Sequence, residues 1–313
     1  MGRWSPDARS IRRRLLAWFA RERRDLPWRH DREPWRVLVS EVMLQQTQAA
    51  RVAERFGAFM DRFPTPRAMA DATPAAALAA WSGLGYNRRA VALQRTAREV
   101  ATDGWPVDVA GLEGLPGIGP YTARAVAAIA FGQPVGAVDT NVRRWLVRRY
   151  GLADEVPRAE LQRLADALAA ADGPATTDLE AASWMHASME FGARICSSRR
   201  PRCDACPIAA GCPSRNTDRH VPVTRQAAFA GSPRAARGAL IRSLAAAAGH
   251  RLALDELTDD QRAVVAALAE EGLLHEAAGS IHLGGAPEGA AATEIAATAE
   301  IAATEAAPST IRA

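Results

Sequence analysis

The stretch LPGIGPYTARAVAAIAFG, residues 115–132, places two glycines around Ile118, after a proline and before a run of helical character. Because glycine adopts backbone conformations that other residues avoid, this pattern predicts a tight hairpin between two helices. The second helix would then expose backbone N–H groups at its N-terminus, with the helix dipole behind them. Such donors bind a phosphate without reading base sequence. The same residues could also form an ordinary helix connector.

The form Leu-Pro-Gly-Ile-Gly before a helix is typical of the helix-hairpin-helix element that binds DNA. Apolar residues also recur at helical spacing within residues 11–22, 41–60 and 160–170, and no convincing strand alternation occurs before residue 220. We therefore predict an all-α fold. A length of 313 residues with 48% hydrophobic residues is enough for two or three domains.

The charge distribution indicates a polyanionic partner. All 39 basic residues are arginine, which excludes any mechanism that needs a lysine amine. Residues 1–220 carry 32 arginines against 24 acidic residues, whereas residues 221–313 carry 7 against 11. A basic body with an acidic tail favours a nucleic-acid partner, although solvated surface charge alone can produce the same asymmetry.

All four cysteines lie within CSSRRPRCDACPIAAGC, residues 196–212. The N-terminus lacks the apolar segment of a signal peptide, and arginines interrupt the apolar runs before they reach membrane-spanning length. We therefore expect a cytoplasmic protein without a membrane partner. Because a reducing compartment disfavours two disulfides, the cysteines are interpreted as metal ligands or redox groups. The six histidines are scattered without ligand spacing.

Two carboxyl groups stand in informative surroundings. Glu41 lies in the apolar stretch VLVSEVML, where apolar neighbours disfavour its ionised form, as a general acid requires. An exposed helix glutamate is the alternative. Asp139, in VDTNV, precedes a helical segment, so its carboxylate is expected at a helix N-terminus. Most aspartates in this position only cap the helix.

The order LPGIGPYTA, VDTNV and Cys-x6-Cys-x2-Cys-x5-Cys resembles the helix-hairpin-helix DNA glycosylase superfamily, in particular its iron–sulfur branch of endonuclease III and MutY-type enzymes. The resemblance covers residues 10–217. The stretches LPWR, residues 26–29, and SEVMLQQTQ, residues 40–48, are similar to the MutY-type adenine glycosylases. The resemblance implies a base excision repair glycosylase that removes adenine mispaired with 8-oxoguanine or guanine in double-stranded DNA.

The resemblance also implies roles for the catalytic residues. Glu41 matches the glutamate that would protonate adenine at N7 once the base has rotated out of the duplex. Asp139, ionised, would stabilise the oxocarbenium-like sugar or trap it covalently before water completes hydrolysis. Tyr121 stands where bifunctional relatives have a lysine that forms a Schiff base, which implies a monofunctional enzyme without lysine-dependent lyase activity. Asn141 and Tyr121 match residues that position the sugar and the attacking group.

Further positions match family residues that hold the adenine or the DNA. They belong to the adenine pocket, the first two glutamines of LQQTQ, a contact near the mispair and the hairpin glycines: Trp28, Arg29, Glu190, Gln45, Gln46, Tyr86, Gly117 and Gly119. Gln46 matches the side chain that wedges into the duplex. For Trp28 and Tyr86, packing in a core is an equally good interpretation.

The cysteine spacing differs from ferredoxin patterns and from zinc patterns with two Cys-x2-Cys pairs, and it favours a [4Fe–4S] cluster over zinc. The resemblance implies a cluster outside the catalytic centre, with the ligands Cys196, Cys203, Cys206 and Cys212. The loop between the first two cysteines would become a rigid projection, and its guanidinium groups would contact DNA phosphates: Arg199, Arg200 and Arg202.

A two-lobed fold with a small additional module is expected. The N-terminal helix, within residues 1–30, would pack with the cluster lobe, residues 141–219, while residues 31–140 form a six-helix lobe with the hairpin. Residues 220–285 predict a winged-helix-like module of two or three helices and a short β ribbon. Residues 286–313 predict a low-complexity, disordered tail. We expect a monomer associated with a bacterial nucleoid.

Departures from the family pattern leave alternatives open. Thr140 stands where many MutY-type proteins have glycine, and no pattern after residue 220 matches the β-rich domain with which relatives inspect 8-oxoguanine. A thymine or uracil mismatch glycosylase of the same superfamily would also have tyrosine at position 121 but would lack Glu41. A non-catalytic iron–sulfur or zinc protein could bind DNA through the hairpin and the arginines alone.

Overall fold

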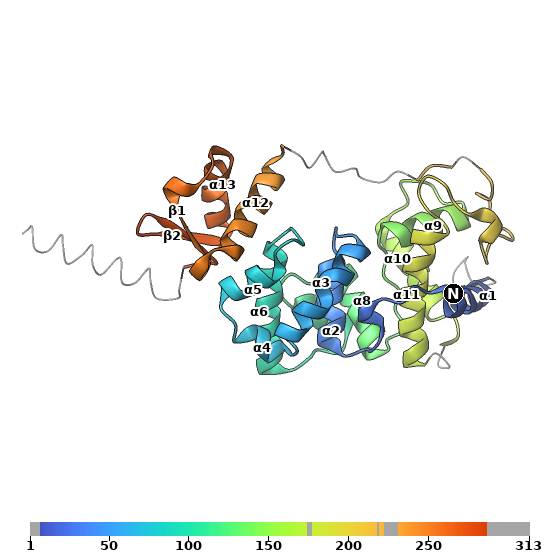
Figure 1. Cartoon of the computed structure of the whole chain (residues 1–313). Helices are drawn as coiled ribbons and strands as arrows, with labels where there is room; N and C mark the ends of the chain where they lie inside the picture. Colours follow the sequence, from blue (N-terminus) through green and yellow to red (C-terminus); the bar gives the residue numbers. More distant parts are fainter. Residues whose placement is uncertain (1–6, 174–176, 218, 222–230, 287–313) are drawn as a thin grey trace, which may run out of the picture. The chain divides into compact units, whose positions relative to one another are not determined.

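The computed structural model describes residues 7–173, 177–217, 219–221 and 231–286 (Figure 1). The chain divides into two compact units, Met1–Asp71 with Ala92–Ala227 and Ala72–Val91 with Ala228–Ala313. Within the described ranges no helix is long and apolar enough to cross a membrane. The predicted low-complexity tail, from residue 287 onward, lies outside the described residues.

The first unit is built from helices, and its described residues contain no strand, which confirms the predicted all-α fold. Its elements are α1 (Ala8–Glu22), η1 (Pro27–Arg29), α2 (Pro34–Leu44), α3 (Ala49–Arg62), α4 (Pro66–Ala70), most of α6 (Arg88–Asp103), α7 (Val109–Gly114), α8 (Pro120–Phe131), α9 (Thr140–Tyr150), α10 (Arg158–Ala169), α11 (Asp178–Arg194) and η3 (Cys203–Ala205).

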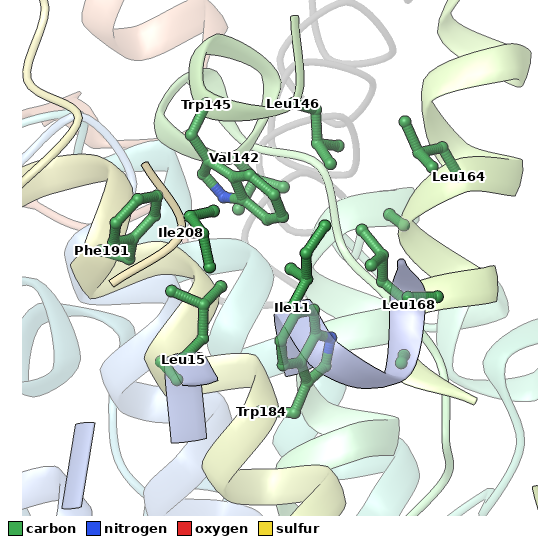
Figure 2. Packing of buried hydrophobic residues seen from close by; sticks show 14 of the residues in the cluster. Ile11, Leu15, Val142, Trp145, Leu146, Leu164, Leu168, Trp184, Phe191 and Ile208 are labelled. Atoms are coloured by element: carbon green, nitrogen blue, oxygen red, sulfur yellow. The ribbon is translucent and has the colours of Figure 1, made fainter. Parts of the chain in front are cut away.

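One core of this unit lies where α1, α9, α10 and α11 meet (Figure 2). The ring of Trp145 packs edge to face on Phe191 and on Trp184, with centroids 5.8 and 6.5 Å apart. Ile11 of α1 is buried in the same cluster. Ile208, between the third and fourth cysteines, is buried there as well, so the cysteine segment is anchored on this core.

Helix α8 packs against both α2 and α11. Its buried face consists mainly of small residues: Thr122, Ala123, Ala125, Val126, Ala127, Ala128 and Ile129. Since the distance between packed helices depends on the side chains at the contact, small residues let both neighbours approach closely. This packing brings the first turn of α8, the end of α2 and one face of α11 to a common cleft.

The second unit combines helices with a small antiparallel sheet in the order β1-β3-β2. Its elements are α5 (Pro74–Trp81), the first turn of α6, α12 (Pro233–Ala246), η4 (Ala248–His250), β1 (Arg251–Ala253), η5 (Leu254–Glu256), α13 (Asp259–Glu270), β2 (Leu274–Ala277) and β3 (Ser280–Leu283). Two helices and a β hairpin after residue 230 are compatible with the predicted winged-helix-like module. Their contact with α5, far earlier in the chain, was not predicted.

Candidate active site

The hairpin between α7 and α8 forms as the sequence predicts. α7 ends at Gly114, and Gly119 is the N-cap residue of α8. Gly117 has a φ of +75°, and a Cβ there would lie 2.5 Å from the Cβ of Ala92. Backbone conformation and space therefore both require glycine at position 117. Gly117 and Gly119 lie on the wall of the cleft.

The cleft has a volume of about 1190 Å³ and lies within the first unit. Most residues that the sequence nominated for the adenine site line it: Trp28, Arg29, Glu41, Gln45, Gln46, Gly117, Gly119, Tyr121, Asp139, Asn141 and Glu190. The four cysteines line a different, smaller cavity. The fold thus brings together residues from η1, α2, the hairpin, the start of α9, and α11.

Glu41 lies on α2 with only 3% of its surface exposed. Burial is the main cause that raises the pKa of its carboxyl to about 7. The carboxylate of Asp139 acts in the same direction, whereas the hydroxyl of Tyr121 and the guanidinium of Arg29 oppose it. A carboxyl that is about half protonated near neutral pH can donate a proton to a bound substrate.

Tyr121 lies in the first turn of α8, and its hydroxyl hydrogen-bonds to the Glu41 carboxyl. The hydroxyl oxygen also lies 2.7 Å from the Sδ of Met189. Burial, followed by the charges of Glu41 and Asp139, raises the pKa of the hydroxyl well above its usual range. Tyr121 therefore stays protonated and acts as a hydrogen-bond donor.

Asp139 is the N-cap residue of α9. Its Oδ1 accepts a hydrogen bond from the backbone N–H of Val142 at 2.6 Å, and its Oδ2 accepts one from the Nδ2 of Asn141 at 2.7 Å. Burial raises the pKa of the carboxyl, while these hydrogen bonds and the charge of Arg144 oppose that shift. The structure thus combines the capping role with a place on the cleft wall.

Asn141 is itself held by Arg144, which is 5% exposed. The Nη2 of Arg144 donates to the Oδ1 of Asn141 at 2.9 Å and to the backbone oxygen of Gly192 at 2.5 Å. Its Nε donates to the backbone oxygen of Cys196 at 2.7 Å. One buried guanidinium therefore joins the start of α9, helix α11 and the first cysteine.

The contact between α11 and the start of α9 makes Gly192 sensitive to substitution. A Cβ at position 192 would lie 2.5 Å from the backbone oxygen of Asn141 and 2.9 Å from its Cβ. We expect Gly192→Ala to lower the free energy of unfolding by about 1–3 kcal/mol, because the backbone must shift to make room. Chemical denaturation measures this change. Gly57→Ala is the control, since a Cβ at position 57 of α3 meets no atom within 4 Å; similar losses in both variants would contradict the prediction.

Glu190 on α11 is 1% exposed and is engaged by three arginines. Its carboxylate forms ion pairs with Arg29, with Arg24 at 3.3 Å and with Arg194 at 3.1 Å. Burial alone would raise the pKa of this carboxyl, but the arginines, Arg29 first, hold it below its usual value. Glu190 therefore stays ionised and holds Arg29 on the cleft wall.

Three other nominated residues differ in their surroundings. Trp28 is 4% exposed and packs edge to face on Phe56, with centroids 6.0 Å apart, so it contributes to a core as well as to the cleft. The Nε2 of Gln45 donates to the Oγ1 of Thr122 at 3.1 Å. Gln46 is exposed and has a φ of +55°, a conformation that residues other than glycine rarely adopt.

Tyr86 belongs to the second unit, where it is 40% exposed with a φ of +49°. The guanidinium of Arg89 lies over the rings of Tyr86 and Trp81, 5.4 and 5.2 Å from their centroids. Arg89 also donates to the backbone oxygens of Leu84 and Gly85 at 3.2 and 2.9 Å. Tyr86 is therefore an ordered, exposed aromatic residue and not part of a core.

His186 also lines the cleft, although no sequence motif pointed to this residue. Its ring stacks on Phe19, with centroids 6.4 Å apart. Burial, followed by the charge of Arg29, lowers the pKa of the imidazole to about 3, so the ring is neutral. His186 lies one helical turn before Glu190 and so shares its face of α11, but this spacing by itself does not indicate a role for a histidine.

The four cysteines line one small cavity together with Trp145, Phe191 and Ile208. Arg148 donates to the Sγ of Cys196 at 3.6 Å and to the backbone oxygen of Ser197 at 2.6 Å, which holds the start of the loop. No three potential ligands among the described residues lie close enough to hold a single metal ion. The four cysteine side chains nevertheless border the same cavity. The loop arginines are exposed: Arg199, Arg200 and Arg202.

Comparison with solved structures supports the fold. A thermostable thymine-DNA glycosylase shares 28% sequence identity and superposes with a TM-score of 0.60, covering 66% of this chain and 95% of that one. The structure of a trapped endonuclease III–DNA covalent intermediate gives a TM-score of 0.55 over 67% of this chain and 95% of that one. Because the two sequences are only 23% identical, this comparison supports the fold and nothing further.

Comparison with known sequences identifies the family. Residues 39–170 match the HhH-GPD superfamily of base excision DNA repair proteins. The chain is 44% identical over 244 residues to the adenine DNA glycosylase of Mycobacterium tuberculosis, covering 74% of this chain and 78% of that protein. It is 37% identical over 237 residues to the human adenine DNA glycosylase, covering 72% of this chain and 43% of that protein. The resemblance inferred from the sequence motifs is confirmed, and the chain belongs to the adenine DNA glycosylase family of the HhH-GPD superfamily.

Proposed function

We propose that the protein hydrolyses the N-glycosidic bond of adenine in double-stranded DNA as a monofunctional glycosylase. The observation that carries this proposal is a single cleft that holds a buried carboxyl with a pKa of about 7, Glu41, and a hydrogen-bonded carboxylate, Asp139. Two carboxyl groups in different surroundings can divide the work of glycosidic cleavage. The adenine glycosylases among the relatives support adenine as the base.

The reaction begins when adenine leaves the base stack and enters the cleft, at a cost of a few kcal/mol that is lowest for a mispaired base. Glu41 donates its proton to N7, so that adenine departs as a neutral base when the N-glycosidic bond breaks. Asp139 in its ionised form stabilises the positive charge that develops on the sugar, or bonds to it transiently, until water completes hydrolysis. Tyr121 orients Glu41 through its hydrogen bond.

The adenine pocket is proposed to lie along α11 and η1. Arg29, held by Glu190, supplies hydrogen-bond donors, and the neutral imidazole of His186 supplies one donor and one acceptor. This combination suits the edge of a purine, which carries both an exocyclic amine and ring acceptors. Trp28 closes the pocket with an apolar surface.

DNA is the proposed partner because the structure offers two phosphate-binding features, a helix N-terminus on the cleft wall and exposed arginines on the cysteine loop. The N-terminus of α8 follows the hairpin, and helix N-termini bind phosphates through their backbone N–H groups. The exposed loop arginines add positive charge, so affinity should fall with salt. We further propose that the mispaired partner of adenine is 8-oxoguanine or guanine, with Gln46 contacting the duplex at the mispair; a DNA contact of Tyr86 stays a prediction from the resemblance.

A single-turnover cleavage assay tests this proposal. End-labelled duplexes carry A opposite 8-oxoguanine, G, C or T, and parallel duplexes carry T or U opposite G. We expect strand cleavage only after alkali treatment, for A opposite 8-oxoguanine and G. Cleavage without alkali, with a product trapped by borohydride, would contradict the monofunctional assignment. Excision of T or U but not of A would favour a mismatch thymine or uracil glycosylase instead. Binding of the duplex without excision would favour a non-catalytic DNA-binding protein.

We also propose that Cys196, Cys203, Cys206 and Cys212 hold a [4Fe–4S] cluster, which would order the loop between the first two cysteines and would take no part in the bond cleavage. Without a metal, burial is the main cause that raises the pKa of the Cys206 thiol to about 11, so this thiol would lose its proton only when iron binds. We expect purified protein to be brown and to contain iron and inorganic sulfide, and Cys206→Ala to lose both. Colourless protein that contains stoichiometric zinc would contradict the cluster.

A further inference from the structure

The segment between α8 and α9 delivers Asp139 to the cleft without any regular structure of its own. It runs from Gly132, the C-cap residue of α8 with a φ of +68°, to Val138. A loop of this kind has to be fixed by partners outside itself, because buried backbone groups need hydrogen bonds. Ala137 is only 2% exposed, so the segment passes through the interior directly before Asp139.

The partners of the segment converge on the backbone of Gly136. Its N–H donates to the Oδ1 of Asp166 at 2.9 Å. Its carbonyl oxygen accepts from the Nη1 of Arg124 at 3.1 Å and from the Nε2 of Gln162 at 2.8 Å. The same Oδ1 of Asp166 also accepts from Arg124 at 2.6 Å and from Gln162 at 3.2 Å. Arg124 comes from α8, and Gln162 and Asp166 come from α10.

Gly136 can enter this network only because it has no side chain. A Cβ at position 136 would lie 2.6 Å from the carbonyl carbon and oxygen of Ala165 and 2.7 Å from its Cβ. The segment is therefore pressed directly on the backbone of α10, one residue before Asp166. Close backbone contact and a set of convergent hydrogen bonds are two independent signs that this position is held tightly.

We infer that Asp166 is a positioning residue for the excision reaction: by holding the Gly136 peptide against α10, it sets the position of the Asp139 carboxylate in the cleft. Gly136 lies three residues before Asp139, Ala137 between them is buried, and Val138 packs against the core cluster, so a shift of the Gly136 peptide would be passed along a short, packed stretch to Asp139. The inference rests on the proposed role of Asp139 in adenine excision. It assigns no contact between Asp166 and the DNA.

The test compares Asp166→Ala and Asp166→Asn in the full-length protein. With enzyme in saturating excess over a duplex with A opposite 8-oxoguanine, the single-turnover rate constant reports the bound complex, and a titration reports the Kd. We expect Asp166→Ala to lower the rate constant by about 10- to 100-fold, because a displacement of a catalytic group by up to 1 Å has an effect of this size. The Kd for the duplex should stay within about threefold of the wild-type value. Asp166→Asn keeps an oxygen for the Gly136 N–H and should recover most of the rate.

A merely structural role would lower the melting temperature but leave the rate constant of the bound complex unchanged, because unfolded protein does not contribute at saturation. Glu271→Ala is the matched control: its ion pair with Arg237 has the same 2.6 Å separation and similar exposure, and it lies in the second unit. If Asp166→Ala does not fold, Gln162→Met replaces it and should slow excision as well.

Two results would overturn the inference in distinguishable ways. If the wild type is active and Asp166→Ala excises adenine at the same rate, Asp166 has no positioning role, and the proposed function still stands. If the wild-type protein releases no adenine, the proposed function is wrong, and the positioning role of Asp166 is wrong with it.

Discussion

Glu41→Gln is expected to lower the single-turnover rate of adenine excision by about 10²- to 10⁴-fold, the range that general acid catalysis contributes. Glutamine keeps the shape of the side chain and its hydrogen-bonding oxygen, but its amide has no acidic proton to transfer to N7. Duplex binding should remain, since the change removes no phosphate contact. Excision and binding measured on the same duplex, with A opposite 8-oxoguanine, separate these two effects.

The pH dependence of excision provides a second test of Glu41. Because the pKa of Glu41 is about 7 and the proposed mechanism uses its protonated form, the rate should be high below pH 7 and should fall about tenfold per pH unit well above it. At low pH the rate should fall as the Asp139 carboxylate takes up a proton. Because burial raises the pKa of Asp139, this fall should begin at a higher pH than for an ordinary aspartate. A rate that rises steadily from pH 6 to pH 9 would contradict the assignment of Glu41 as the acid.

Burial of the Glu41 carboxyl lowers the free energy of unfolding at neutral pH. Its folded pKa lies above the unfolded value of 4.5, so the fold loses stability as pH rises from about 4.5 to 7 and stays lower beyond it. The full effect is on the order of 3 kcal/mol. Glu41→Gln should therefore raise the melting temperature at pH 8 but not at pH 4. Glu54→Gln, at an exposed position of α3, is the control and should change neither excision nor melting.

Asp139→Asn is expected to lower the excision rate by about 10²- to 10³-fold, the loss found when one electrostatic contact to a transition state is removed. Asparagine caps a helix about as well as aspartate, so the N-terminus of α9 should survive the change. The single-turnover assay should show the loss, while the free energy of unfolding should change by less than about 1 kcal/mol.

Asp108 offers a matched control for this experiment. It is the N-cap residue of α7, and its Oδ1 accepts a hydrogen bond from the backbone N–H of Gly111 at 2.7 Å, the same arrangement that Asp139 has with Val142. Asp108→Asn should leave excision unchanged. If Asp139→Asn excises adenine as fast as Asp108→Asn does, Asp139 is only a cap, and the catalytic interpretation fails.

Local sequence predicted the features that depend on a few neighbouring residues. The hairpin at Gly117, the helix that follows it and the cap at Asp139 all arise from backbone conformations and hydrogen bonds within one helical turn. The all-α fold before residue 220 followed from the spacing of apolar residues. By contrast, the place of His186 on the cleft wall and the role of Gly136 depend on helices that are distant in the chain, and the sequence contained no reliable signal for either.

The sequence by itself determined which chemistry is available: two carboxyl groups, a tyrosine in place of lysine, four cysteines and no amine side chain. Only the tertiary structure decided what the groups do, because the pKa of Glu41 is set by the atoms that exclude water from it. The hydroxyl of Tyr121 comes from α8, the carboxylate of Asp139 from the start of α9 and the guanidinium of Arg29 from η1. The apolar neighbours of Glu41 along the chain predicted the direction of its pKa shift, but the contributions of Tyr121, Asp139 and Arg29 act through space from distant segments, so no pattern along the chain could specify them.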